Sequence, residues 1–415
     1  MSLLAKRSVS KEDKSNIITL GAIAGKEKAK DPTVINSTIG MLYGEDGKLF
    51  VFDSVNKALN NLTDKEKYAY ASTPGSNEFH EAIKHWVFRE YYDEFMNNSY
   101  TSVMATPGGT GALSNVFSNY LNEGDYALLP NYMWGNYKQI AYEAYAAYKT
   151  YNLFDEAGNF NITDLKEKVL TQKKEQNRVF IVINDPCQNP TGYSMKDSEW
   201  DMVIDILNEV SNDGTPTILL HDMAYIDYDL RGFDATRKNI RKYLKLNDSV
   251  ITIMAFSGSK TLGLYGIRIG AMLAVTKKKE YIDEFFSSAK FASRSKWSNS
   301  SMLGQSLITK IFTETSLRTS FEKELELARN TLINRAKTFE TLAKEYKLEM
   351  IPFECGFFLA IPCENPEEVY KLLVTKKIHI IPMNKFIRVT ISSITTSEVQ
   401  VLPKMIKWAI EETTK

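Results

Sequence analysis

Residues 250–270, VITIMAFSGSKTLGLYGIRIG, carry the strongest structural signal in the chain. The first seven of these residues are almost all apolar, which is typical of a strand buried on both faces of a parallel sheet. Small residues follow the strand, so we expect Lys260 to lie at the mouth of the sheet, three residues after Ser257 and eight before Arg268. Serine and arginine suit a phosphate, and a lysine beside them suits a Schiff base with a phosphorylated aldehyde.

Composition limits the classes of partner. The 415 residues suggest one large and one smaller domain, at roughly 100–200 residues per domain. The 51 basic and 51 acidic residues balance, so charge gives no argument for binding nucleic acid or an anionic membrane. A small, neutral or anionic substrate remains compatible with this balance.

Cysteine and histidine spacing does not predict a metal site. The three cysteines lie too far apart in sequence for a disulfide framework or a thiolate site, and the four histidines lack ligand spacing. We find no secretory signal and no apolar run long enough to cross a bilayer. We therefore expect a soluble protein in a reducing cytoplasm.

Short apolar runs alternate with stretches of helical period along the chain, which indicates an α/β fold with a mostly parallel sheet covered by helices. One helix is expected after Gly111, where apolar residues form a single stripe. The expected strands span residues 126–129, 179–183, 217–220, 250–256 and 271–275.

The pattern changes near Thr313 and predicts a smaller α+β domain. A long amphipathic helix is expected first, then the two strand-like runs LEMIPF (348–353) and GFFLAIP (356–362). A helix from Pro366, the strand FIRVTI (386–391) and a closing helix after Thr396 complete this domain. We expect three segments: an N-terminal arm that joins the small domain (1–55), the large domain (56–312) and the C-terminal small domain (313–415).

Polar side chains follow three consecutive expected strands. Asn189 lies in the turn NPTG, Asp222 and Tyr225 follow the next strand, and Ser257 and Lys260 follow the third. Open α/β sheets bind ligands at the carboxyl ends of their strands. The sequence therefore predicts one site with an amide, a carboxylate, a phenol and an amine.

This ordered series resembles the pyridoxal-phosphate aminotransferases of fold type I (class I/II), particularly the aspartate and aromatic amino acid branch. The resemblance extends from TIGMLYGEDGKLFVFDSV (38–55) to FIRVTI (386–391). Each motif alone is weak, but NPTG, Asp-x-x-Tyr, Ser-x-x-Lys and Arg in this order, each at a strand end, form a specific pattern. The resemblance implies pyridoxal 5′-phosphate as cofactor and a homodimer with shared active sites.

The resemblance implies roles for four of these residues. Lys260 would hold the cofactor as a Schiff base and then carry the proton at the substrate α-carbon. Asp222 would pair with the pyridinium nitrogen and maintain the ring as an electron sink. Tyr225 and Asn189 would hydrogen-bond the phenolic oxygen of the ring.

The cofactor phosphate would be held by several segments. Gly109 and Thr110 lie in TPGGTGAL (106–113), a glycine-rich turn that opens a helix and suits an anion. Ser257 and Arg268 would contact the same phosphate. Tyr70 resembles a tyrosine that reaches the phosphate from the neighbouring subunit.

The substrate would meet other residues. Arg388 matches the arginine that binds the α-carboxylate through a planar fork of donors. Trp134 matches the aromatic residue that stacks on the cofactor, while Asn189 and Gly40 match residues that contact the substrate. Arg294 aligns with the arginine that binds a side-chain carboxylate across the subunit interface.

The chain departs from the family at three places. Gly108 stands where serine is often found, and Tyr137 stands where aspartate enzymes commonly have histidine. Ser300 and Ser301 replace a pair of prolines after Arg294. The substrate is therefore left open between aromatic and acidic amino acids.

Other interpretations exist for these features. Asp222 can be a helix N-cap, NPTG an ordinary turn, Trp134 a core residue and Arg294 a surface residue. The same scaffold can also support a carbon-sulfur lyase, a decarboxylase or a cyclase, or a non-catalytic regulator that binds the cofactor. The favoured hypothesis is an aminotransferase that works in two half-reactions.

Overall fold

The computed structural model describes residues 2–9, 11 and 17–414. Its centre is a seven-stranded sheet with the order β2-β8-β7-β6-β5-β3-β4. Strands β7, β6, β5, β3 and β4 are parallel, whereas β8 is antiparallel to both of its neighbours. The strands are β2 (Tyr100–Thr106), β3 (Tyr126–Pro130), β4 (Ala147–Tyr151), β5 (Val179–Asn184), β6 (Thr217–Asp222), β7 (Val250–Ser257) and β8 (Gly270–Thr276).

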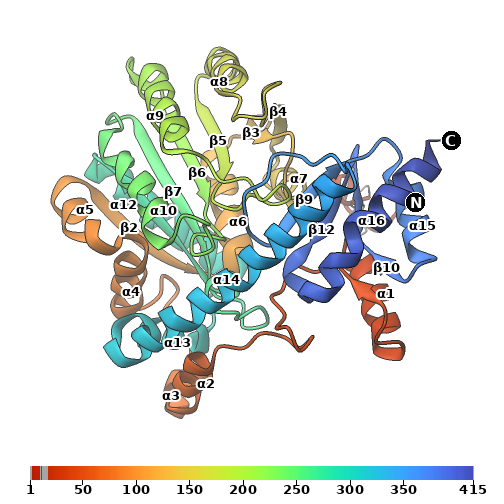
Figure 1. The fold of residues 1–415 in the computed structure, drawn as a ribbon. Coiled ribbons are helices and arrows are strands. Elements are labelled where there is room, and N and C mark those ends of the chain that lie inside the picture. Colours follow the sequence, from red (N-terminus) through yellow and green to blue (C-terminus); the bar gives the residue numbers. More distant parts are fainter. Residues whose placement is uncertain (1, 10, 12–16, 415) are drawn as a thin grey trace.

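Helices cover both faces of this sheet (Figure 1). Side chains alternate between two cores; Ile218 and Leu220 of β6 face one core, and Leu219 faces the other. One face carries α6 (Gly108–Tyr120), α7 (Asn136–Glu143) and α12 (Lys279–Lys296). The other carries α4 (Asn77–Phe88), α5 (Tyr92–Asn98), α8 (Ile162–Gln176), α9 (Asp197–Ser211), α10 (Phe233–Arg241) and α13 (Met302–Thr313).

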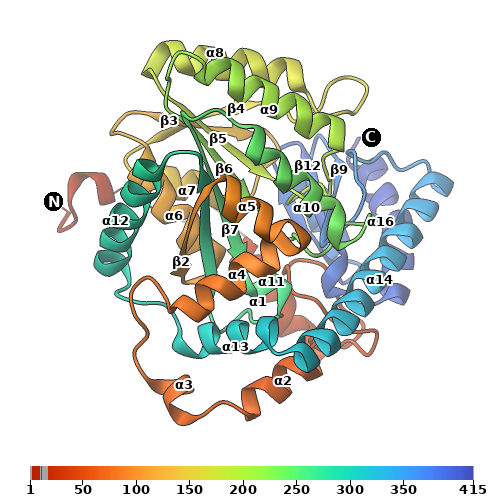
Figure 2. The ribbon, with the colours of Figure 1, turned by 90° about the vertical axis from the view of Figure 1, so that its left-hand side faces the viewer.

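The C-terminal part contains a third core and two small sheets. One sheet is antiparallel, with the order β11-β12-β9, and β1 pairs with β10 in the other. Figures 1 and 2 both show the C-terminal helices (blue) gathered to one side of the large sheet (green). The elements are β1 (Ile35–Asn36), β9 (Phe358–Pro362), β10 (Ile378–His379), β11 (Ile381–Met383), β12 (Phe386–Thr390), α1 (Ile17–Lys30), α14 (Thr315–Glu345), α15 (Pro366–Val374) and α16 (Thr396–Thr413).

The remaining elements are short. They are the helices α2 (Asp53–Asn60), α3 (Asp64–Tyr68) and α11 (Gly258–Thr261) and the 3-10 helices η1 (Lys6–Ser8), η2 (Arg89–Tyr91), η3 (Lys242–Lys245) and η4 (Ile391–Ser393). Helix α14 contacts two of the three cores: Leu325 and Leu332 pack in the core that contains Leu219, and Phe339 packs in the C-terminal core. No helix in the described part of the chain is long and apolar enough to span a membrane.

The expected α/β architecture is confirmed, and the five expected strands correspond to β3, β5, β6, β7 and β8. The strand expected at 348–353 is wrong: Ile351 N–H donates to Ala360 O, but Pro352 has no N–H and no strand forms. Strands β2 and β4 were not expected from the sequence. The division at 55/56 and 312/313 stays a prediction.

Candidate active site

A cavity of about 580 Å³ lies at the carboxyl ends of the central strands. Neighbouring strands end together there, because Asn184 of β5 pairs with Asp222 of β6, and Asp222 pairs with Ala255 of β7. The cavity brings together the predicted residues Gly40, Gly109, Thr110, Trp134, Asn189, Asp222, Tyr225, Ser257, Lys260, Arg268 and Arg388. Segments more than 300 residues apart in sequence thus form one site.

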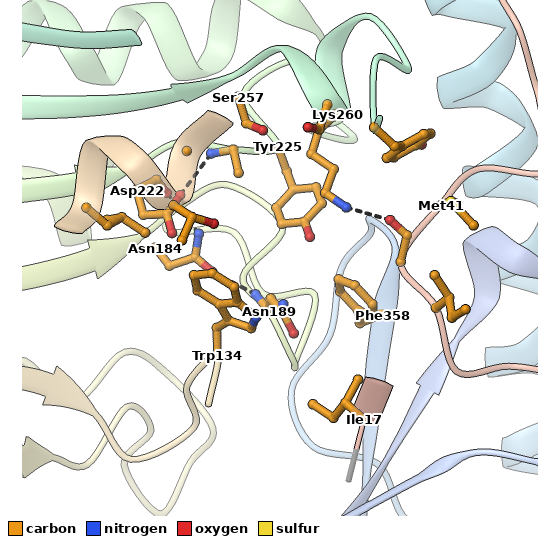
Figure 3. A pocket seen from close by; sticks show the side chains of 18 of the residues that line it. Ile17, Met41, Trp134, Asn184, Asn189, Asp222, Tyr225, Ser257, Lys260 and Phe358 are labelled. Carbon is orange, nitrogen blue, oxygen red and sulfur yellow. Dashed lines mark hydrogen bonds between the residues drawn. The ribbon is translucent and has the colours of Figure 1, made fainter. Parts of the chain in front are cut away.

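Lys260 projects from the short helix α11 into this cavity, where its amine lies opposite Tyr225 (Figure 3). The Nζ atom donates a hydrogen bond to Gly40 O. Burial, together with the positive charges of Arg388 and Arg268, lowers the pKa of Lys260 to about 7, and the charge of Asp222 opposes this shift. Near neutral pH a large share of this amine is therefore uncharged and nucleophilic.

Asp222 ends β6 and is 6 % exposed. Burial raises the pKa of this carboxyl, and hydrogen bonds from Tyr137 and the Ala224 N–H lower it. The Tyr137 hydroxyl donates to Oδ2 at 2.5 Å, and the Ala224 N–H donates to Oδ1 at 3.2 Å. A fully buried carboxylate with two donors can face a cationic ring nitrogen.

Asn184 connects the two loops beside the carboxylate. Its amide donates to Asp222 O at 2.8 Å, and its Oδ1 accepts from the Asn189 N–H at 2.8 Å. Tyr225 is buried against Phe357 and Phe358, with ring centroids 5.1 and 6.0 Å away. Burial raises the pKa of Tyr225 well above its ordinary value, so its hydroxyl stays a donor at neutral pH.

The start of α6 lies in the cavity and is suited to bind an anion. No described side chain caps this helix, so the backbone N–H groups of its first turn are available to a ligand. Gly108 has φ +73°, and a Cβ there would lie 2.5 Å from Nη2 of Arg268, which explains the glycine. The Arg268 guanidinium also donates to Ser259 Oγ at 2.9 Å, and Ser257 lies beside Gly109.

Arg388 projects from β12 into the same cavity. Its Nη2 donates to Thr38 O at 2.8 Å, and its Nη1 donates to Asn189 Oδ1 at 3.4 Å. The Nε atom is buried without a hydrogen-bond partner among the described residues. Burial lowers the pKa of Arg388 to about 10, so the group is still cationic at neutral pH. A buried cation with an unmatched donor suits a carboxylate ligand.

The cavity wall near Arg388 and residues 39–41 is apolar. Ile17 and Ile18 of α1, Ile39 and Met41 line it, and Figure 3 shows Ile17 and Met41 on the Phe358 side of the cavity. Gly40 lies between Ile39 and Met41, where a Cβ would lie 2.5 Å from Cζ of Phe358. Residues 39–41 therefore pack closely against the site.

Two predicted residues lie outside the cavity. Tyr70 is 94 % exposed, between α3 and α4. Arg294 is exposed near the end of α12 and donates to Ser298 Oγ. Their expected roles across a subunit interface therefore stay predictions.

Sequence reasoning did not assign roles to four further residues of the site: Asn184, Ser259, Tyr265 and Tyr137. Tyr265 accepts a hydrogen bond from Leu42 N–H at 2.9 Å, and its ring lies 5.2 Å from Lys260 Nζ. Tyr265 follows Lys260 by five residues, so its place in the same loop was a usable signal. Asn184 ends a strand directly before the NPTG segment, and that position was a signal too.

Comparison with known proteins agrees with this geometry. The family model for aminotransferase class I and II matches residues 32–406. An aspartate aminotransferase of Salmonella typhi is 28% identical over 318 residues, which cover 76% of this chain and 77% of that protein. A mitochondrial aspartate aminotransferase of Xenopus tropicalis is 24% identical over 387 residues, covering 91% and 87%.

Solved structures show the same fold. An aminotransferase of Anaerococcus prevotii is 32% identical, with a TM-score of 0.94 over 99% of this chain and 100% of that chain. An aromatic-amino-acid aminotransferase of Burkholderia pseudomallei, covalently bound to pyridoxal phosphate, is 20% identical with a TM-score of 0.81 over 99% and 100%. Because the family model spans nearly the whole chain, this protein belongs to the aminotransferase class I and II family.

Proposed function

We propose that this enzyme moves an amino group between an L-amino acid, aromatic or acidic, and a 2-oxo acid such as 2-oxoglutarate. Its cofactor is pyridoxal 5′-phosphate, as in the family. The observation that carries the proposal is the convergence of Lys260, Asp222 and Arg388 in one cavity. These groups supply a nucleophilic amine, a buried carboxylate and a carboxylate-binding cation.

The residues present fit this cofactor. The uncapped start of α6, Ser257 and Arg268 offer donors to a phosphate, and Gly108 leaves room where a side chain would collide with the guanidinium. Asp222 would face the ring nitrogen, while Asn189 and Tyr225 would donate to the ring oxygen. Trp134 lines the cavity, and its ring is nearly perpendicular to that of Tyr137, with the ring centroids 5.6 Å apart. Its indole face would lie against the ring of the cofactor.

The bound cofactor supplies an aldehyde carbon and a ring that withdraws electrons. Lys260 would contribute the uncharged amine that holds the cofactor, and the same amine would move the proton at the substrate α-carbon. Asp222, as a carboxylate, would stabilise a positive charge on the ring nitrogen. In this structure the Lys260 amine donates a hydrogen bond to Gly40 O, so the segment around Gly40 lies close to the reacting amine.

Arg388 would orient the substrate by its α-carboxylate, replacing the weak 3.4 Å contact with Asn189. The apolar wall of Ile17, Ile18, Ile39 and Met41 then receives the substrate side chain. This wall favours aromatic donors. An acidic side chain would need a further cation, and Arg294 from a second subunit is our candidate.

We also propose that the active unit is a homodimer in the cytoplasm. Exposed aromatic side chains support a buried interface around α3 and α12, since Tyr68, Tyr70 and Phe291 are 80, 94 and 79 % exposed in the single chain. Sedimentation at several concentrations tests the dimer, and fractionation of the source cells tests the location.

Product analysis tests the reaction class. Enzyme loaded with pyridoxal 5′-phosphate is mixed with single amino acids and 2-oxoglutarate, and glutamate is measured. We expect glutamate with aromatic donors first and with aspartate second. Ammonia, carbon dioxide or a sulfide without glutamate would instead indicate a lyase or decarboxylase on the same fold.

A further inference from the structure

Two buried cysteines from distant segments are in contact beside the active site. Cys187 lies in the loop after β5, two residues before Asn189, and Cys355 lies in the loop before β9, three residues before Phe358. Their Sγ atoms are 3.3 Å apart, and the residues are 0 and 1 % exposed. Neither thiol takes part in the proposed reaction.

Backbone contacts hold the two loops together. Gly192 O accepts hydrogen bonds from Glu354 N–H and Cys355 N–H, both at 3.1 Å. Gly356 has φ +109°, and a Cβ there would lie 2.6 Å from Cβ of Cys187, so the loops approach as closely as a glycine permits. The sulfur contact is therefore part of a tightly held junction.

The two sulfurs have different surroundings. Leu230 N–H donates to Cys355 Sγ at 3.1 Å, and Cys355 Sγ lies 3.5 Å from Tyr228 O. Burial raises the pKa of the Cys187 thiol well above its ordinary value, with hydrogen bonding and proximity to Cys355 adding to the shift. The short contact between the sulfur atoms, and not a pKa, therefore pairs the two thiols.

We propose that Cys187 and Cys355 form a site of reversible thiol oxidation, in which a peroxide converts the pair to a disulfide. Hydrogen peroxide first oxidises one of the two thiols to a sulfenic acid, releasing one water. The sulfur of the other cysteine then attacks the oxidised sulfur, forming the S–S bond and releasing a second water. The two thiols lose two electrons and two protons in total, and the peroxide is reduced to water.

The disulfide links the loop after β5, which carries Asn189, to the segment that carries Phe358. A disulfide bond is about 2.05 Å long, so the sulfurs must approach by about 1.2 Å. Asn189 and Phe358, which both contact Arg388, are carried by the two linked loops. Because a displacement of about 1 Å can cost up to about 100-fold in rate, we expect oxidation to lower transamination by about tenfold.

The experiment treats the holoenzyme with hydrogen peroxide, removes the peroxide with catalase, and blocks free thiols after unfolding. Non-reducing peptide mapping should find a linked peptide that contains Cys187 and Cys355, lighter by about 2 Da than the sum of its two free-thiol peptides. Activity should fall with the rise of this peptide and return with dithiothreitol. Oxidation of Met41 in the cavity wall would not be reversed in this way.

Three variants complete the test. Cys187→Ser and Cys355→Ser should each keep the initial activity and lose the dithiothreitol-reversible inhibition, whereas Cys363→Ser should behave as the wild type. The peptide map of the wild-type protein stands even where a variant fails to fold. Equal alkylation of all three cysteines after peroxide, or a linked peptide with unchanged activity, would overturn the proposal.

Discussion

The hydroxyl of Tyr137 donates a 2.5 Å hydrogen bond to Oδ2 of Asp222, and both residues are buried. Burial raises the pKa of Asp222, and the Tyr137 hydrogen bond is the first of the interactions that lower it. Burial, with the charge of Asp222, raises the pKa of Tyr137 well above its ordinary value, so the phenol remains a donor. Tyr137 therefore opposes the effect of burial and favours the ionised form of Asp222.

Tyr137→Phe should raise the pKa of Asp222 further, because a hydrogen bond to a charged group contributes roughly 1.5–3 kcal/mol. When the pH is lowered, Asp222 then becomes protonated at a higher pH than in the wild type. The acid limb of the kcat/KM profile should therefore shift to higher pH. The profile and the affinity for pyridoxal 5′-phosphate are measured together. Tyr137→His restores a donor and is the control; an unmoved acid limb in Tyr137→Phe contradicts this role.

The pKa of Lys260, lowered to about 7 by burial and by Arg388 and Arg268, predicts how the cofactor is captured. The uncharged amine attacks the aldehyde, so the capture rate of the apoenzyme should rise with pH through about 7 and then level off. Stopped-flow absorbance measures this rate. Asp222→Asn should lower the midpoint, since Asp222 raises the pKa of the amine. A rate that still climbs toward pH 10 would rule out a perturbed lysine.

Arg388→Lys should lower kcat/KM by about 10–100-fold, because lysine loses the bidentate fork that recognises a carboxylate, worth roughly 1.5–3 kcal/mol. Most of the loss should appear in KM. Cofactor affinity, which depends on the other end of the cavity, should remain close to that of the wild type. Loss of cofactor affinity together with unchanged KM would place Arg388 with the phosphate residues instead.

Arg294→Ala tests the origin of substrate choice. If Arg294 binds a side-chain carboxylate across a dimer interface, the variant should lose about 10–100-fold in kcat/KM for aspartate and little for phenylalanine. Kinetics with both donors measure the ratio. Equal losses for both donors would remove Arg294 from the specificity pocket.

Buried strands were predictable because burial on both faces leaves nearly continuous apolar runs, as in β5 and β7. Strand β4 was not, since it pairs only with β3 and four of its five residues are exposed. The prediction of a strand at residues 348–353 was wrong, because the apolar residues of this segment pack in a core without forming a ladder of strand hydrogen bonds around Pro352. Apolarity alone does not separate a strand from packed loop.

The site was predictable where motifs stand at strand ends, as with Asp222 and Lys260, because parallel strands end at one edge of the sheet. The partnership of Tyr137 with Asp222 was not, since it joins residues 85 positions apart. The roles of Tyr70 and Arg294 rest on the proposed homodimer, since both residues are exposed and lie outside the cavity of the single chain.

The central claim is that Lys260 carries the cofactor. Reduction of the holoenzyme with borohydride, followed by peptide mapping, tests it most directly, because reduction fixes the cofactor to the lysine that holds it. We predict one phosphopyridoxyl group per chain, on Lys260. The Lys260→Ala variant should lack this group and should lose nearly all turnover. A label on another lysine, or full turnover in Lys260→Ala, would contradict the account.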